Sequence, residues 1–326
     1  MGRSGVEVAV AKAGVRETAC SAVSAALGEP MAGTAAAAST WLCIEQPGPY
    51  GADALLESHL DHAVGAELAR RAKDSGVRIQ LIRRPGRHAD DHHALTHRQV
   101  FLAHTRPGAT WLERAEVADP EELLDLDFAA AGAGVSQAFG VRDERPLLLV
   151  CTNGRRDVCC ALLGRPVAHE LVREYGDAVW ESTHTGGHRF APTGVLLPTG
   201  YLYGRLDLAF AGQVLERAAA GEVVVDRCRG RSVWSPPGQV AELAVRERID
   251  EVAADALTVE VEEEYDDGWR ARVTSRDGRA WWVRGQEREL RPERRTSCAK
   301  APVTPTAHIV TGVDEIVPAI AAPVAP

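Results

Sequence analysis

Hydrophobic residues recur along the chain as short apolar runs and as helically spaced sets, and together they predict alternating strands and helices. An apolar strand is predicted at 41–45, followed by helical spacing of leucines over 55–72. Three further strands are expected at 77–82, 100–104 and 110–117, with a helix over 120–130. The first part of the chain therefore has the order β-α-β-β-β-α.

The same order returns farther along the chain. A fully apolar strand at 146–151 is followed by a helix at 160–175, a strand at 178–181 and a hairpin over 194–206. Asp207 then caps a last helix, since Asp is a favoured N-cap residue. The repetition indicates an internal duplication of a βαβ then ββα unit, which is the thioredoxin topology of a mixed sheet covered by helices. We therefore predict an α/β fold with two tandem thioredoxin-like units.

Composition divides the chain into segments around these units. The segments are a flexible Ala-rich lead-in at 1–38, a thioredoxin-like unit without cofactor ligands at 39–135, a ligand-bearing ferredoxin unit at 140–225, a C-terminal helix with a small antiparallel sheet at 230–300, and a loose tail rich in Pro, Ala and Val at 301–326. Asp277-Gly278 marks a hairpin within the small sheet.

Composition and charge narrow the possible functions. The 326 residues are 45% hydrophobic and 25% charged, as in ordinary globular proteins, and the net charge of −9 argues against general nucleic-acid binding. No apolar stretch approaches the roughly 18 residues of a membrane helix, and no signal-peptide core is visible. We therefore expect a cytoplasmic protein without membrane partners. The chain also has no Gly-rich dinucleotide fingerprint, so any nicotinamide or flavin must come from another protein.

Seven cysteines in such a protein point to metal or redox chemistry, because disulfides are rare in reducing compartments. Cys151 closes an apolar strand, and Cys159 and Cys160 open the following helix. Free N–H groups at a helix N-terminus favour a thiolate there, and Arg155 and Arg156 add positive potential.

Two histidines follow the next strand as His184-Thr-Gly-Gly-His188. The glycines permit positive φ angles, so both imidazoles can converge on one point. Two thiolates and two imidazoles form a four-ligand set suited to zinc or to a [2Fe–2S] cluster. Structural zinc sites prefer shorter Cys spacings than Cys-x8-Cys, which favours the cluster, with cysteines on one iron and histidines on the other. Spacing alone leaves Cys159 as a competitor of Cys160.

Three stretches resemble the sucrase/ferredoxin-like proteins: CTNGRRDVCCA at 151–161, HTGGHRFAPTGVLLPTG at 184–200 and RGRSVWSPPGQVAELAVR at 229–246. The resemblance implies a thioredoxin-like [2Fe–2S] ferredoxin with bis-histidine ligation. It assigns one iron to Cys151 and Cys160 and the other to His184 and His188. Asn153 departs from the pattern, because the family often has His there. The word sucrase in the family name implies no glycosidase chemistry.

Other residues are expected near the cluster without binding it, namely Cys159, Arg155, Arg156, Asp157, Gly186, Gly187 and Pro192. Asp157 either tunes the cluster or caps the helix, and Pro192 resembles the cis-proline of thioredoxins. The remaining cysteines are interpreted as packing or incidental thiols, and Cys298 has no assigned role.

The leading hypothesis is a one-electron carrier between unidentified redox proteins, with no catalytic residues of its own. Its potential is expected nearer the Rieske range, roughly −150 to +300 mV, than the about −400 mV of plant-type ferredoxins. Two alternatives stay open. One is a thioredoxin-like thiol–disulfide oxidoreductase, although no Cys-x-x-Cys is present. The other is a zinc-stabilised binding module.

Overall fold

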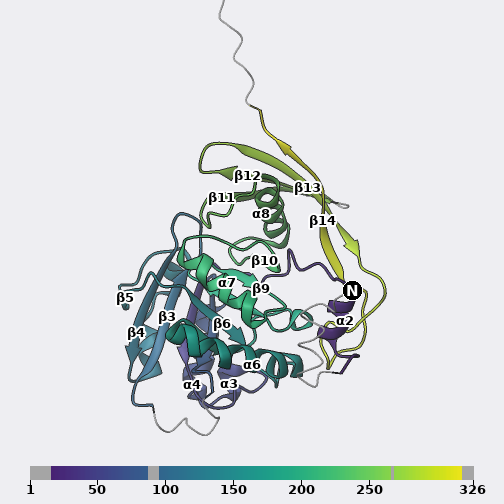
Figure 1. Cartoon of the computed structure of the whole chain (residues 1–326). Helices are drawn as coiled ribbons and strands as arrows, with labels where there is room; N and C mark the ends of the chain where they lie inside the picture. The colour runs from purple at the N-terminus through teal and green to yellow at the C-terminus, as the bar shows by residue number, and fades with distance from the viewer. Residues whose placement is uncertain (1–15, 87–94, 266–267, 318–326) are drawn as a thin grey trace, which may run out of the picture.

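The computed structural model describes residues 16–86, 95–265 and 268–317 (Figure 1). Its main feature is one large mixed sheet whose strand order is β10-β9-β8-β6-β7-β2-β1-β3-β4-β5. The strands are β1 Thr40–Glu45, β2 Val77–Arg83, β3 Arg98–His104, β4 Trp111–Val117, β5 Val141–Arg142, β6 Leu147–Cys151, β7 Val179–Ser182, β8 Gly194–Leu197, β9 Tyr201–Tyr203 and β10 Cys228–Arg231.

The strand order repeats within this sheet. In the first half β1 pairs in parallel with β2 and antiparallel with β3, which pairs antiparallel with β4. In the second half β6 pairs in the same way with β7 and β8, and β8 pairs with β9. The halves meet where β2 and β7 pair antiparallel, through Ile82 with Ser182 and Arg83 with Glu181. The predicted α/β class is confirmed, and the two halves contribute to one continuous sheet.

Helices cover the outer faces of both halves. The described helices are α2 Cys20–Ala26, α3 Ala54–Glu57, α4 His62–Ala72, η2 Pro120–Asp125, α5 Phe128–Gly132, α6 Val158–Tyr175, η3 Gly176–Ala178, η4 His188–Phe190, α7 Leu208–Ala219 and α8 Pro236–Ile249. Of these, α2 packs on η4, and α8 packs mainly on a second sheet, separate from the large one. The single helix predicted over 120–130 is replaced by η2 and α5. Leu126 is extended between them, and the Asp127 carboxylate accepts a hydrogen bond from the Ala130 N–H, which starts a new helix.

The inner face of the sheet carries a core shared by both halves. Trp41 and Phe101 from the first half pack in one group with Trp180 from the second. The Phe101 and Trp180 rings lie 5.6 Å apart although β2 and β1 separate their strands in the sheet. The sheet must therefore curl so that its halves face each other. A hydrogen bond of 2.8 Å from Arg231 Nε to the Thr105 carbonyl joins the end of β10 to the residue that follows β3, and so links the two halves across the curl.

A second, smaller sheet is antiparallel and has the order β11-β12-β13-β14. Its strands are β11 Leu257–Tyr265, β12 Gly268–Ser275, β13 Ala280–Glu289 and β14 Thr306–Glu315. The predicted hairpin at Gly278 is confirmed, with a φ of 91° at that residue. Helix α8 packs on this sheet through Val240 and Val245.

Two segments expected to be loose are ordered in their described parts. Within 301–326, Thr306–Glu315 forms β14 and pairs along β13, burying Ala307. Within 1–38, Cys20–Ala26 forms α2, and Cys20 and Ala35 are buried. Short Ala- and Val-rich runs look featureless in sequence, but here they gain order by packing on distant elements. Residues 1–15 and 318–326 lie outside the described residues, and the other segment boundaries stay predictions.

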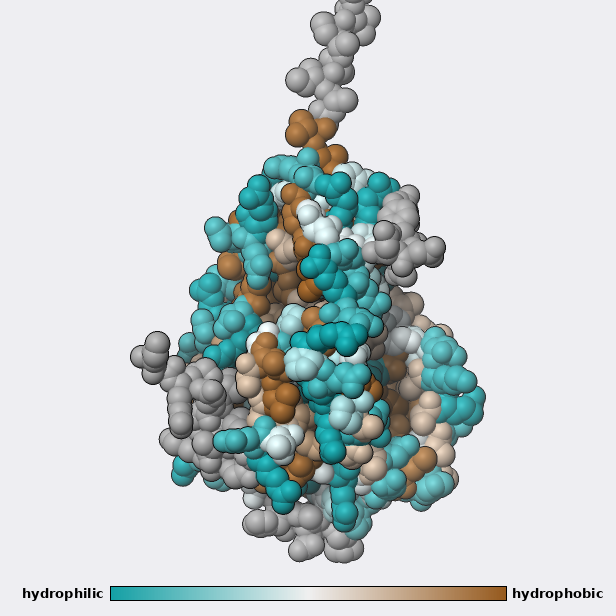
Figure 2. Space-filling view, turned by 90° about the vertical axis from the view of Figure 1, so that its right-hand side faces the viewer, coloured by the Kyte–Doolittle hydropathy of each residue, from teal (hydrophilic) through white to brown (hydrophobic). Residues whose placement is uncertain are grey.

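None of the described helices combines the length and apolar character needed to cross a bilayer. Figure 2 shows the side of the molecule that lies at the right in Figure 1, near α2 and β14. Hydrophilic residues cover most of this face, with apolar residues scattered between them.

Candidate metal centre

The first loop of the centre, residues 152–157, connects β6 to α6. Its start is fixed by the N–H of buried Cys151, which donates to the Thr193 carbonyl at 2.8 Å. Asn153 is buried, and its side-chain oxygen accepts from the N–H groups of Arg155 and Arg156, both at 3.2 Å. Asn153, the departure from the family pattern, therefore builds the turn. The side chains of Arg155 and Arg156 are exposed.

Asp157 ends this loop as the N-cap of α6. Its Oδ1 accepts from the Cys159 N–H at 3.0 Å, which confirms the capping role among the two considered for this residue. Cys159 and Cys160 follow in the first turn, and both are fully buried. The cap thus fixes where both thiols sit.

The second loop, residues 184–188, follows β7. Gly186 and Gly187 have φ angles of 85° and 69°, so the predicted positive φ values are confirmed. His184 and His188 are half-buried, and their rings stack with centroids 3.9 Å apart and an interplanar angle of 11°. The glycine pair therefore folds the loop back until its two histidines lie side by side.

The two loops bring the four predicted ligand residues together, and we call this group the Cys/His centre. His184 Nδ1 lies 4.0 Å from Cys151 Sγ, and His188 Nδ1 lies 3.9 Å from Cys160 Sγ. The donor atoms of Cys151, Cys160 and His184 all fall within 4.8 Å of one another. The sulfurs form the buried side of the centre and the imidazoles its half-exposed side.

The thiols of Cys151 and Cys160 influence each other's pKa. The neighbouring Cys160 thiol lowers the pKa of Cys151, and Cys151 in turn raises the pKa of Cys160. The helix N-terminus had suggested a thiolate at Cys160, but two adjacent buried thiolates repel, so Cys151 is the more acidic thiol of the pair. Burial, aided by the charge of His184, lowers the pKa of His188 to about 4. His188 is therefore neutral near pH 7, the form that binds metals.

Arg229 on β10 holds the histidine loop, a role that sequence reasoning missed. It is buried, and its guanidinium donates to the Gly186 carbonyl and to Thr34 Oγ1, both at 3.0 Å. A Cβ at Gly187 would lie 2.5 Å from Arg229 Nη2, so only glycine fits there. Burial lowers the pKa of Arg229 to about 9, which leaves it charged at pH 7. Its place in the stretch RGRS was the available signal.

The first half of the sheet, which lacks the residues of the Cys/His centre, also supports the histidine loop. Gln80 and Arg78 on β2 donate to the His184 carbonyl at 3.4 and 3.3 Å. Gln80 in turn accepts from Thr183 Oγ1 at 2.6 Å. β2 therefore carries part of the bonding that positions His184.

The first half also supports the cysteine loop, because Arg83 on β2 holds Glu181 on β7. Glu181 is buried and pairs with Arg83 of β2, with a shortest N–O distance of 2.6 Å. The same carboxylate oxygen accepts from Thr152 Oγ1 at 2.8 Å. No sequence motif marks these contacts, because they join residues 98 and 29 positions apart.

Of the remaining candidate residues, Pro192 lies beside the cysteine loop, and Cys159 points away from the Cys/His centre. The Ala191–Pro192 peptide is cis, and Pro192 precedes the Thr193 carbonyl that accepts from Cys151. Cys159 is directed elsewhere, toward Cys20 and Cys298, whose sulfurs lie 3.9 and 3.4 Å from its own. Because of this, Cys160 is the helix cysteine that joins Cys151 in the Cys/His centre.

Comparison with known proteins gives one match. No curated protein and no solved structure matched the chain. The model of the family described as sucrase/ferredoxin-like matches residues 31–230. This range runs from before β1 into β10 and includes all four residues of the Cys/His centre. The chain therefore belongs to the sucrase/ferredoxin-like family.

Proposed function

We propose that the protein carries single electrons on a [2Fe–2S] cluster, with Cys151 and Cys160 on one iron and His184 and His188 on the other. The observation that carries the proposal is the convergence of two buried sulfurs and two half-buried imidazoles from separate loops. Thiolate and imidazole are ligands that iron–sulfur clusters take in proteins, and family membership agrees with this donor set.

The bound cluster would supply one-electron transfer, and the surrounding residues would set its direction and charge. The buried thiols anchor it from the core, while the half-exposed histidines form the side from which an electron can reach a partner. Each Nδ1 faces a sulfur, so each Nε2 is the nitrogen left to hold or release a proton. The potential is therefore expected to depend on pH.

Positive groups around the centre offset the negative charge of the thiolates and sulfides. Arg229 is a buried cation that bonds the histidine loop, and α6 directs its N-terminus at Cys160. Both favour the reduced state, which carries the additional electron. Removal of the Arg229 charge, or of the partial positive charge at the N-terminus of α6, is expected to lower the reduction potential of the cluster.

The proposal extends to the fold of the chain, its cellular compartment and its redox partners. The repeated strand order supports two thioredoxin-like units, of which the second holds the cluster. Seven free thiols suit a reducing compartment such as the cytoplasm. Donor and acceptor are proposed to be other redox proteins.

The test is anaerobic purification after iron-supplemented expression, with visible absorption, iron and acid-labile sulfide measured per chain. We expect a coloured protein with equal iron and sulfide. His184→Cys and His188→Cys should each keep a cluster with a changed spectrum and a lower potential, because thiolate adds negative charge. His62→Cys, an exposed position on α4, is the control and should change neither. Unchanged spectra in both ligand variants would reject the assignment.

A single zinc ion in the Cys/His centre is the second candidate. The sulfur–nitrogen distances of 3.9 and 4.0 Å are close to those of one tetrahedral ion. For zinc that separation is about 3.6 Å. A cluster has a larger span, so it requires the two loops to move apart. A colourless protein with stoichiometric zinc at this centre after iron-replete expression would favour zinc and reject the electron carrier.

A further inference from the structure

Three cysteines that sequence reasoning left without a common role form a second group beside the Cys/His centre. Cys20 comes from α2, Cys159 from the first turn of α6, and Cys298 from the segment after β13. Their sulfurs lie 3.9 Å apart for Cys20 and Cys159, 3.4 Å for Cys159 and Cys298, and 3.5 Å for Cys298 and Cys20. Up to 278 positions along the chain separate them, so folding alone brings them together.

A carboxylate completes the group. Asp157 Oδ2 lies 3.7 Å from Cys20 Sγ, and the four donor atoms all lie within 4.8 Å of one another. The same oxygen accepts from the Cys298 N–H at 2.9 Å and from Ser297 Oγ at 3.1 Å. These bonds position Asp157 toward the sulfurs, and Oδ1, which accepts one hydrogen bond from the Cys159 N–H, keeps a lone pair for a cation.

We propose that Cys20, Cys159, Cys298 and Asp157 bind a zinc ion, separate from the Cys/His centre. A tetrahedral zinc site with Zn–S bonds of about 2.3 Å requires sulfur separations of about 3.8 Å, and sulfur–oxygen separations of about 3.6 Å. The observed sulfur separations of 3.4, 3.5 and 3.9 Å and the sulfur–oxygen separation of 3.7 Å differ from these values by a few tenths of an ångström.

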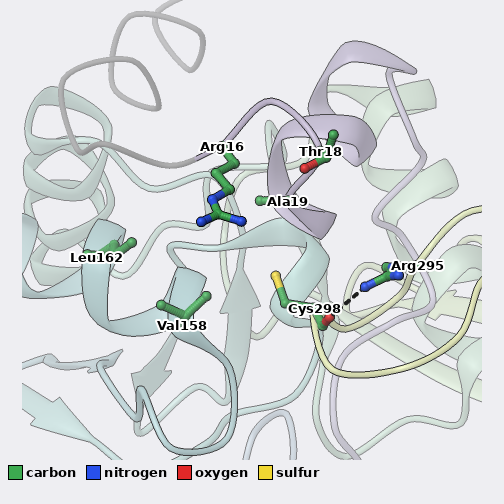
Figure 3. Close-up of a pocket in the computed structure, with 7 residues that line it drawn as sticks. All are labelled: Arg16, Thr18, Ala19, Val158, Leu162, Arg295 and Cys298. Atoms are coloured by element: carbon green, nitrogen blue, oxygen red, sulfur yellow. Dashed lines mark hydrogen bonds between the residues drawn. The ribbon is translucent and has the colours of Figure 1, made fainter.

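The surroundings suit an anionic zinc site. Cys20 and Cys159 are buried, with Leu163 and Ala191 packed against them. A cavity of about 370 Å³ opens beside half-buried Cys298, and Figure 3 shows the guanidinium groups of Arg16 and Arg295 beside it. Those cations and the N-terminus of α6 offset the charge of three thiolates and a carboxylate.

Zinc there would connect three distant segments of the chain. It would tie α2 and the segment after β13 to the turn that carries Cys160. Its role is therefore structural, since all four protein donors are used and no open position is left for a substrate.

The test is zinc analysis of the full-length protein purified anaerobically, with and without mild chelation. Wild type should hold zinc in addition to iron. Cys298→Ser should bind zinc at least about a hundredfold more weakly, because losing a metal ligand costs more affinity than losing a residue that only hydrogen-bonds a ligand. Cys298→Ser should keep the visible spectrum of the iron–sulfur cluster. Cys43→Ala, a buried thiol in β1, is the control and should keep both metals.

A second variant separates this proposal from the first. Cys160→Ser should lose iron and sulfide but keep zinc. When cobalt replaces that zinc, the protein should show thiolate-to-cobalt charge-transfer absorption, and the additional substitution Cys298→Ser should weaken this absorption. Equal zinc binding by wild type and Cys298→Ser would overturn the proposal, whether or not the iron–sulfur cluster is found. So would a disulfide between any two of the three cysteines in the anaerobic protein.

Discussion

Replacement of Gly187 by alanine tests whether buried Arg229 positions the histidine loop. Two costs add at this residue. A φ of 69° is strained for alanine, at about 1–2 kcal/mol. The new Cβ would also lie 2.5 Å from Nη2 and 2.7 Å from Cζ of Arg229, so the guanidinium must leave its place. Hydrogen bonds made by charged groups contribute about 1.5–3 kcal/mol each. Because Arg229 bonds both Gly186 and Thr34, we expect a total loss of about 4–8 kcal/mol.

Two other glycines separate the two costs. Gly186→Ala lies in the same loop at a φ of 85°, but its Cβ would meet Arg229 at 3.7 Å, an ordinary contact. Gly108→Ala has a φ of 73° and open space around its Cβ. Both should lose only the strain of about 1–2 kcal/mol.

The assay is urea unfolding of the metal-free proteins, paired with metal content of the same variants as purified. Gly187→Ala should be the least stable of the three and should retain the least metal. If Gly187→Ala and Gly186→Ala agree within about 0.5 kcal/mol and bind equal metal, Arg229 does not hold the loop, and the reasoning fails.

Two further predictions concern charge. Burial of His188 lowers its pKa from 6.5 to about 4, so the unfolded chain binds the additional proton between these values. The stability contribution of His188 in metal-free protein is therefore complete above pH 6.5 and lost as pH falls toward 4. The loss is at most about 3 kcal/mol, nearer 2 at a half-buried ring. Urea unfolding at pH 7 and 5 should show a smaller loss for His188→Asn than for wild type, and equal losses would contradict the assignment. Arg83→Ala leaves buried Glu181 unpaired and should cost about 3–5 kcal/mol, whereas Arg173→Ala, in an exposed pair with Glu170, should cost less than about 1 by the same assay. Similar losses for the two arginine variants would show that the β2–β7 contact is not critical.

Local patterns predicted the elements and the local shape of the two loops well, for physical reasons. The apolar run of β6 and the cap at Asp157 are contained within a few residues, as is the glycine pair between His184 and His188. Each of these features acts through bonds or dihedral angles near its own position.

Long-range support was not predictable in the same way. Arg229, Gln80 and Glu181 act on loops that lie far from them in sequence, and one chain offers no signal of which residues will meet. Cys20 looked incidental, and Cys298 had no assigned role, for the same reason. The helical assignment over 120–130 failed differently, because a second Asp cap within the segment started a separate helix.

The narrow β2–β7 contact has a consequence for how this protein can evolve. One half of the large sheet lacks the residues of the Cys/His centre, but its Arg83 and Gln80 support the loops of the other half. Selection on the half that carries the Cys/His centre therefore also preserves the half without it. Neither half can be deleted, or exchanged between proteins, without exposing β7 or β2 and releasing the contacts that hold the histidine loop. Residues of β2 should consequently change more slowly among relatives than those of β5 at the far edge of the sheet.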